Sequence, residues 1–191
     1  MNVSIPAEFP ELRLFEPRVI PDARGSFAEL FNKDRYRGAG LAASFPQDNV
    51  SISHRNVLRG MHFQHPFGQG KLIVVLVGEV FDVAVDVRVG SPTFGRWAGF
   101  TLTAERLSQL WIPPGFAHGF VVTGESAMVL YKVTEKYVPS AECTIRWDDQ
   151  AIGIAWPVTS PILAARDADA PALADVDPRR LPRWVPEHAS A

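Results

Sequence analysis

Residues 57–71 of the chain read VLRGMHFQHPFGQGK. The first half predicts a β-strand, because bulky apolar residues with high strand propensity recur along it. A proline and two glycines then interrupt the strand, since proline cannot donate to a ladder and glycine favours turns. The segment also carries two permanent cations and two histidines, namely Arg59, Lys71, His62 and His65. Such groups at one strand end favour an anionic ligand or a proton-transfer reaction.

The sequence on both sides of this segment predicts further short strands. Residues 81–88 alternate between apolar and polar side chains, and residues 72–77 are apolar throughout, with a turn expected at residues 78–79. Other strands are expected within residues 11–20, 26–31, 45–53, 97–103, 109–112, 116–122, 127–133 and 142–147, with turns at residues 21–25 and 124–125. Only residues 33–37 predict a short helix. Many short strands at close spacing indicate a sandwich or barrel.

The strand expected at residues 45–53 has two chemically different sides. Polar side chains recur at every second position from Gln47 to Ser53, with Val50 and Ile52 between them. Because side chains alternate across a strand, Val50 and Ile52 are expected to be buried. The polar side is then either exposed or functional.

Length and composition favour one globular domain covering residues 1–191. Residues 157–191 are rich in proline, alanine and aspartate, which predicts a covering C-terminal tail with short helical turns. The net charge of −2 gives no global field for nucleic acid or membrane binding. A single cysteine, Cys143, and an N-terminal segment without an apolar stretch indicate a cytoplasmic protein without a signal peptide.

A metal site is one interpretation of the histidines. Residues 113–118 match the second half-motif of metal-binding cupins, which ends in His118. The first half-motif needs two histidines two residues apart and a following acid, but this chain has His62, Gln64 and no acid before Lys71. Two histidines without a third ligand, beside a lysine, make a poor site for a divalent ion. We therefore expect no metal and no other cofactor.

Acid–base chemistry is the competing interpretation. His62 shares its strand side with small and polar residues, although an isolated strand histidine is often simply packed in a core. Lys71 favours function, because burying a lysine without a purpose is unfavourable. Tyr131 lies between two valines of its own side, so it either packs in the core or presents a phenol to the interior. A base, a cation and a phenol around one cavity suit proton abstraction beside a carbonyl.

An ordered set of motifs extends over nearly residues 3–185. The set comprises FAE at 27–29, QDN at 47–49, LRGMHFQ at 58–64, GKL at 70–72, GEVFDVAVDVR at 78–88, SPTFG at 91–95, QLWIPPGFAHGF at 109–120, LYK at 130–132 and RD at 166–167. Together they resemble the dTDP-4-dehydrorhamnose 3,5-epimerase family. The resemblance implies an all-β cupin-type jelly roll with short peripheral helices, a homodimer, no metal and a dTDP-linked 4-keto-6-deoxyhexose substrate.

The resemblance also implies roles for individual residues. His62 is the expected proton acceptor, Tyr131 the proton donor, and Asp167 the partner that orients His62. Lys71 is expected to stabilise the enolate oxygen. The expected substrate contacts are Arg24, Glu29, Gln47, Asp48 and Asn49 at the nucleotide, Arg59 at the phosphate, Lys71 and His118 near the sugar, Phe27 and Tyr137 stacked on thymine, and Glu142 and Arg166 elsewhere.

Several alternatives remain at this level. A relative that inverts only one carbon, or one that serves a secondary-metabolite sugar, has the same base and phenol. A metal-dependent cupin needs a bound ion, and a non-catalytic sugar binder exchanges no protons. Strict alternation also places Arg59 on the opposite side of its strand from His62. If both residues serve one site, a bulge is required, and Gly60 is the expected place.

Overall fold

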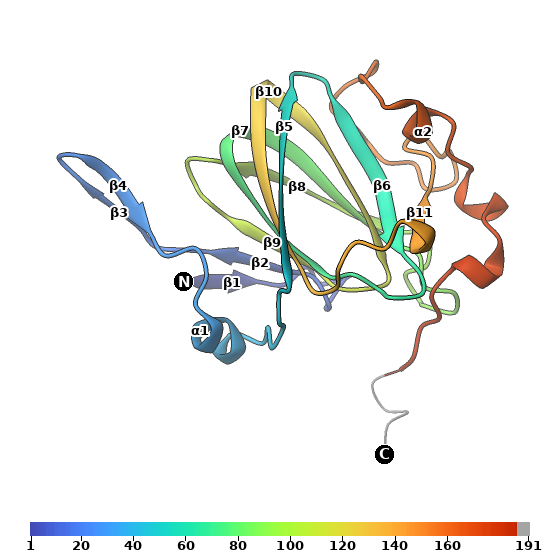
Figure 1. Cartoon of the computed structure of the whole chain (residues 1–191), viewed down its shortest axis with the longest axis horizontal. Helices are drawn as coiled ribbons and strands as arrows, with labels where there is room; N and C mark the ends of the chain where they lie inside the picture. The colour runs from blue at the N-terminus through green and yellow to red at the C-terminus, as the bar shows by residue number, and fades with distance from the viewer. Residues whose placement is uncertain (187–191) are drawn as a thin grey trace.

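The computed structural model describes residues 1–186 and consists mainly of β-strands (Figure 1). The strands are β1 (Asn2–Ser4), β2 (Arg13–Glu16), β3 (Val19–Asp22), β4 (Gly25–Ala28), β5 (Gln47–His54), β6 (Leu58–Gln64), β7 (Lys71–Asp86), β8 (Trp97–Thr103), β9 (Gln109–Ile112), β10 (Phe116–Val133) and β11 (Glu142–Thr144). The helices are α1 (Lys33–Gly38) and α2 (Ala165–Ala168), with 3-10 turns η1 (Pro139–Ala141), η2 (Leu173–Asp175) and η3 (Pro178–Arg180). The predicted all-β class with short peripheral helices is confirmed.

Two long antiparallel strands, β7 and β10, form the centre of the fold. The first half of β7 pairs with β9 and with the second half of β10, and the sheet extends from there to β2 and β1 and, on the other side, to β5. The second half of β7 pairs with β8 and with the first half of β10, next to β6 and β11. Because the same two strands run through both halves, the two sheets face each other as a jelly roll.

The predicted turns at residues 78–79 and 124–125 are wrong, because β7 and β10 continue through them. Instead, the register between the two strands shifts between Val122 and Ala127. Gly78, at the same level, has a φ of +77°, and a side chain there would overlap the carbonyl oxygen of Ser126. The glycine therefore permits a bulge that bends the paired strands without ending them.

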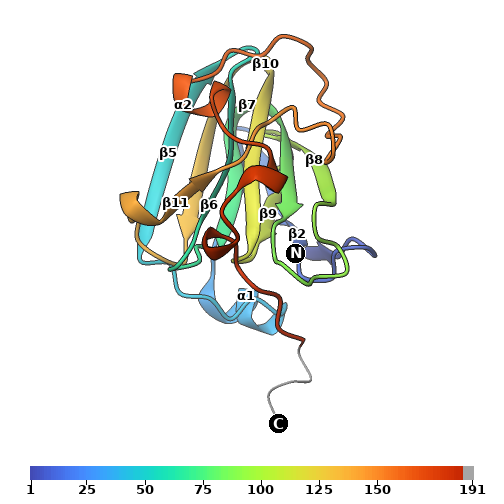
Figure 2. The same cartoon turned by 90° about the vertical axis from the view of Figure 1, so that its right-hand side faces the viewer.

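The C-terminal segment lies against the barrel on the side of β6 and β11 (Figure 2). Leu173 and Leu181 belong to the same buried cluster as Met61, Val83 and Val85 of the barrel strands. The short helix α2 and the 3-10 turns of this segment agree with the helical turns expected there.

None of the helices within residues 1–186 is long and apolar enough to cross a membrane.

The burial expected for β5 is wrong on its apolar side. Val50 and Ile52 are 56% and 66% exposed, whereas Ser53 on the opposite side is buried. Strand β5 is at an edge of its sheet, and its polar side faces a cavity between the sheets that both polar and apolar side chains line. The hairpin of β3 and β4 forms a separate two-stranded sheet that projects from the barrel (Figure 1).

Candidate active site

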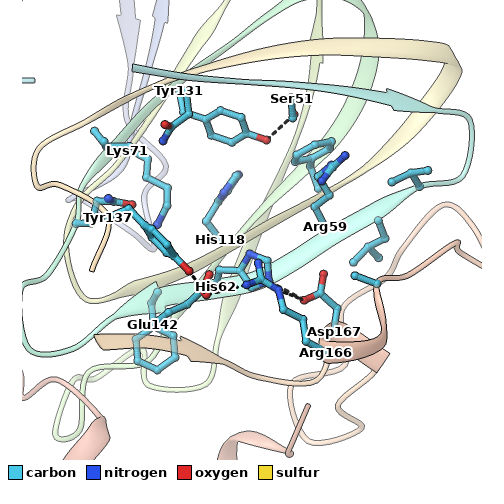
Figure 3. Close-up of a pocket in the computed structure, with 18 of the residues that line it drawn as sticks. Ser51, Arg59, His62, Lys71, His118, Tyr131, Tyr137, Glu142, Arg166 and Asp167 are labelled. Atoms are coloured by element: carbon cyan, nitrogen blue, oxygen red, sulfur yellow. Dashed lines mark hydrogen bonds and ion pairs between the residues drawn. The ribbon is translucent and has the colours of Figure 1, made fainter. Parts of the chain in front are cut away.

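A cavity of about 450 Å³ lies between the two sheets (Figure 3). Strands β5, β6, β7, β10 and β11 contribute to its wall, together with residues in and around α2. Ten residues predicted from the sequence line it, namely Asn49, Arg59, His62, Lys71, His118, Tyr131, Tyr137, Glu142, Arg166 and Asp167. All four residues expected to act in proton transfer or enolate stabilisation are among them.

His62 is oriented by a buried carboxylate from a distant part of the chain. Its Nε2 lies 2.8 Å from Oδ1 of Asp167, which helix α2 places behind the imidazole. An ionised carboxylate only accepts hydrogen bonds, so Nε2 carries the proton and Nδ1 is left as the basic nitrogen. Burial tends to raise the pKa of Asp167, but its hydrogen bonds with His62 and the Gly60 amide outweigh this and lower it. The dyad thus pairs an ionised carboxylate with an imidazole ready to accept a proton.

The bulge expected at Gly60 is present. His62 pairs with His118 of β10, and Arg59 pairs with Phe120. Arg59 and His62 are three residues apart on β6, whereas their partners are two residues apart on β10, so β6 contains one extra residue here. Gly60 has a φ of +129°, and a Cβ atom there would lie only 2.5 Å from the Cα of Gly119. Glycine is therefore required at this position, and the extra residue brings both Arg59 and His62 to the cavity.

Lys71 and His118 lie between Tyr131 and His62 in Figure 3, and together with Asp82 they form a buried charge cluster. Lys71 is 8% exposed, and burial lowers its pKa to about 8, while the carboxylates of Asp82 and Glu142 oppose this shift. Asp82 is fully buried, and both of its oxygens lie 3.0 Å from Nε2 of His118. Burial raises the pKa of Asp82, although His118 and Lys71 favour its charged form. Together these residues place a protonated amine next to the cavity.

Tyr131 is on the opposite side of the cavity from His62 (Figure 3). Its hydroxyl lies 3.0 Å from that of Ser51, and burial raises its pKa, so the phenol is protonated at neutral pH. The Tyr131 ring is held edge-on to His118, with 6.1 Å between ring centroids. A base and a protonated phenol thus face the same space from two sides.

A polar cluster closes the side of the cavity near β11. The hydroxyl of Tyr137 donates to Oε2 of Glu142 over 2.7 Å, and Arg166 donates to the same oxygen over 2.8 Å. Arg166 also lies 3.5 Å from Asp167. These contacts join the predicted stacking residue Tyr137 to the His62–Asp167 pair through side chains alone.

The sequence model of the dTDP-4-dehydrorhamnose 3,5-epimerase family matches residues 6–175 of the chain. The chain belongs to this family. A dTDP-4-dehydrorhamnose 3,5-epimerase from Salmonella typhimurium is 52% identical over 176 residues, which cover 91% of this chain and 96% of the relative. The resemblance inferred from the sequence motifs is thereby confirmed.

Solved structures agree with this assignment. A dTDP-6-deoxy-D-glucose-3,5-epimerase from Legionella pneumophila, in complex with dTDP-4-keto-L-rhamnose, is 45% identical with a TM-score of 0.93, over 97% of this chain and 99% of that chain. A 3'-monoepimerase from Streptomyces bikiniensis, in complex with dTDP-quinovose, is 38% identical with a TM-score of 0.83, over 90% and 88%. The cupin-type jelly roll predicted from the sequence is confirmed by these likenesses.

Five residues that the epimerase family resemblance assigns to the nucleotide are not in the cavity of this chain. Arg24 and Phe27 are on the projecting β3–β4 hairpin, where Arg24 pairs with Asp22 and Phe27 is 68% exposed. Glu29 follows β4 and pairs with Arg35. Asp48 is exposed and pairs with Lys132, and Gln47 accepts a hydrogen bond from the Tyr137 amide. A single chain therefore does not assemble the whole predicted nucleotide site.

The sequence interpretation missed two polar residues of the site region, Ser51 and Asp82. Ser51 was within the polar side of the strand at residues 45–53, and its parity with Asn49 was the available signal. Asp82 belongs to the alternating pattern of residues 81–88, which alone does not show that both sides of β7 are buried there. Within residues 1–186, no group of three or more His, Cys, Asp or Glu side chains is arranged to hold a metal ion.

Proposed function

We propose that this chain is a dTDP-4-dehydrorhamnose 3,5-epimerase of dTDP-L-rhamnose biosynthesis. Its substrate is dTDP-4-dehydro-6-deoxy-D-glucose and its product is dTDP-4-dehydro-L-rhamnose. The observation that carries the proposal is the placement of the His62–Asp167 dyad and the Tyr131 phenol on opposite sides of one cavity, with Lys71 between them. Membership of the epimerase family over residues 6–175 supports the same conclusion.

The chemistry follows from the position of the carbonyl at carbon 4. Carbons 3 and 5 both flank it, so loss of a proton from either carbon gives an enolate. His62 removes the proton through Nδ1, and the Lys71 ammonium stabilises the negative oxygen. Tyr131 then gives its hydroxyl proton to the opposite face of the carbon, which inverts the centre. No metal takes part in these steps, because the ammonium supplies the positive charge.

Binding of the diphosphate and sugar is assigned to cavity residues. Arg59 suits a diphosphate because its planar fork stays charged, and its Nε is held by the Ser53 hydroxyl at 2.9 Å. Lys71 and His118, which line the cavity, are assigned to the sugar carbonyl, and Asn49, Glu142 and Arg166 to the rest of the substrate. Tyr137 is 47% exposed at this side and is available to stack on thymine.

A homodimer accounts for the residues that one chain leaves outside its cavity. The outer side of β5 and β10 is apolar, because Val50 is opposite Leu130 and Ile52 is opposite Met128. A second copy of the chain is the proposed cover of this surface. Its β3–β4 hairpin then supplies Arg24 and Phe27, followed by Glu29, to the nucleotide end of the neighbouring cavity.

The cytoplasmic location stays a prediction from the sequence.

Incubation with the 4-keto substrate in deuterated water tests the proposed reaction. The expected result is deuterium at carbons 3 and 5, together with inverted product, after treatment of the enzyme with excess chelator. Label at one carbon only would instead favour a single-carbon epimerase, such as the similar protein from Streptomyces bikiniensis. Binding without any exchange would contradict the proposal and favour a sugar binder, and loss of exchange on chelation would favour a metal-dependent cupin.

A further inference from the structure

The hydroxyl of Ser51 is 3.0 Å from the hydroxyl of Tyr131. Ser51 is on β5, where its direct partner on β10 is Val129, so it reaches Tyr131 diagonally across the two strands. Within residues 1–186, Tyr131 is the one side-chain partner of the Ser51 hydroxyl, and Ser51 is the one hydrogen-bond partner of the Tyr131 hydroxyl. The two groups are therefore coupled to each other in preference to the rest of the site.

The Tyr131 ring is already fixed by other contacts. Its centroid lies 6.1 Å from that of His118 and 6.4 Å from that of Phe120. These contacts restrict the plane of the ring, but they donate nothing to its oxygen. Once the phenol has given up its proton, the oxygen carries a negative charge in a buried position. Asp82 disfavours that charge and Arg59 favours it from a distance. Among the residues that the structure describes, only the Ser51 hydroxyl is placed to donate to it directly.

We propose that Ser51 is a positioning residue for the acid step, which holds the Tyr131 hydroxyl toward the substrate and donates a hydrogen bond to the phenolate. The inference rests on the proposed function and adds a residue to it. In the step concerned, the O–H bond of Tyr131 breaks and a C–H bond forms at the enolate carbon. The enolate electrons form that bond while the C=O bond is restored, and the charge moves to the tyrosine oxygen. Water later returns a proton to the phenolate.

The neighbouring Ser53 provides a matched control. It lies two residues further on the same side of β5, but its hydroxyl accepts from the Nε of Arg59 instead of contacting Tyr131. Loss of the Ser53 hydroxyl is therefore expected to raise KM through the diphosphate contact. Loss of the Ser51 hydroxyl is expected to act on kcat through the phenol.

The test measures inversion and solvent deuterium exchange together in Ser51→Ala, Ser51→Thr and Ser53→Ala. For Ser51→Ala we expect inverted product to form on the order of 10- to 100-fold more slowly, as for a lost hydrogen bond to a charged group. Exchange is expected to stay near the wild-type rate, because His62 and Lys71 are intact. Ser51→Thr keeps a hydroxyl and should restore the ratio of inversion to exchange, and Ser53→Ala should leave that ratio unchanged.

A double variant separates action through Tyr131 from general damage. In a Tyr131→Phe background, Ser51→Ala should have no further effect on inversion, since the group it serves is absent. An unchanged ratio in Ser51→Ala, an equal fall in exchange and inversion, or additive effects in the double variant would overturn the inference. A wild-type enzyme that neither exchanges nor inverts would overturn the proposed function itself, and the inference with it.

Discussion

The basic nitrogen of His62 is determined by the carboxylate behind it. Asp167 accepts from Nε2 over 2.8 Å, which leaves Nδ1 as the unprotonated nitrogen of this cavity-lining residue. The raised pKa of Tyr131 and the pKa of about 8 for Lys71 have the same origin, namely burial beside the cavity. At the scale of single residues, the site thus consists of groups whose protonation states are set by the packing around them.

Replacement of His62 by alanine tests the base. We expect His62→Ala to lower kcat by about 10²- to 10⁴-fold with a much smaller change in substrate Kd, the usual result of losing a general base. Steady-state kinetics and calorimetric binding of dTDP measure the two effects. His54→Ala is the control, because this histidine is exposed at the end of β5 and outside the cavity. Near-normal turnover in His62→Ala would remove this residue from the mechanism.

The pH profile tests Lys71. Its ammonium must be protonated to stabilise the enolate, so kcat/KM should fall as the pH rises through about 8. Asp82 favours the charged lysine, and Asp82→Asn should therefore move this alkaline limb to lower pH. The exposed Glu105→Gln should leave it in place. If the alkaline limb of kcat/KM stayed at the same pH in Asp82→Asn, Lys71 would not be the group whose titration produces it.

At the scale of elements, β6 and its bulge decide which side chains meet. Arg59 and His62 serve one cavity only because the strand gains a residue relative to β10 between them. The long strands β7 and β10 also depart from regular pairing at the level of Gly78, where a bulge lets both strands continue. Local departures from regular pairing therefore create the concave shape.

Alanine in place of Gly60 tests the bulge. Its Cβ atom would meet backbone atoms of Gly119 and His118 at 2.5 and 2.8 Å, with a φ of +129° that alanine disfavours. We expect the free energy of unfolding to fall by about 1–3 kcal/mol or more, as in overpacked sites. Urea denaturation measures the change. Gly38→Ala in α1 is the control, since nothing lies within 4 Å of its Cβ position, and equal unfolding free energies for the two variants would contradict this account.

At the scale of the whole molecule, the barrel leaves an apolar sheet face and a projecting hairpin unused. Val50 and Ile52 are exposed on β5, and Phe27 is exposed on β4. An exposed apolar face of this kind is typical of an interface. The proposed homodimer covers that face and completes the nucleotide end of each cavity.

A charge on the apolar face tests the homodimer. Ile52→Glu should yield monomers by light scattering, because burying an unpaired carboxylate in an interface is unfavourable. The KM of the variant should also rise, because the monomer lacks the contacts that the partner's β3–β4 hairpin makes with the nucleotide. Glu125→Gln, on an exposed bend of β10, should remain dimeric. A wild-type protein that is monomeric at working concentration and fully active would contradict both the dimer and the shared site.

The sequence by itself determined the family and most of the strands, and it named the candidates for the acid–base pair. Period-two patterns and turn residues act locally, so β8 and β9 begin and end where the sequence predicts. The tertiary structure alone decided what depends on distant neighbours. Gly78 became a bulge because β10 continues beside it, and Val50 and Ile52 are exposed because no other element within residues 1–186 covers the outer side of β5. Likewise, His62 and Asp167 meet across 105 positions, and Ser51 finds Tyr131 across 80, through packing that no local pattern encodes.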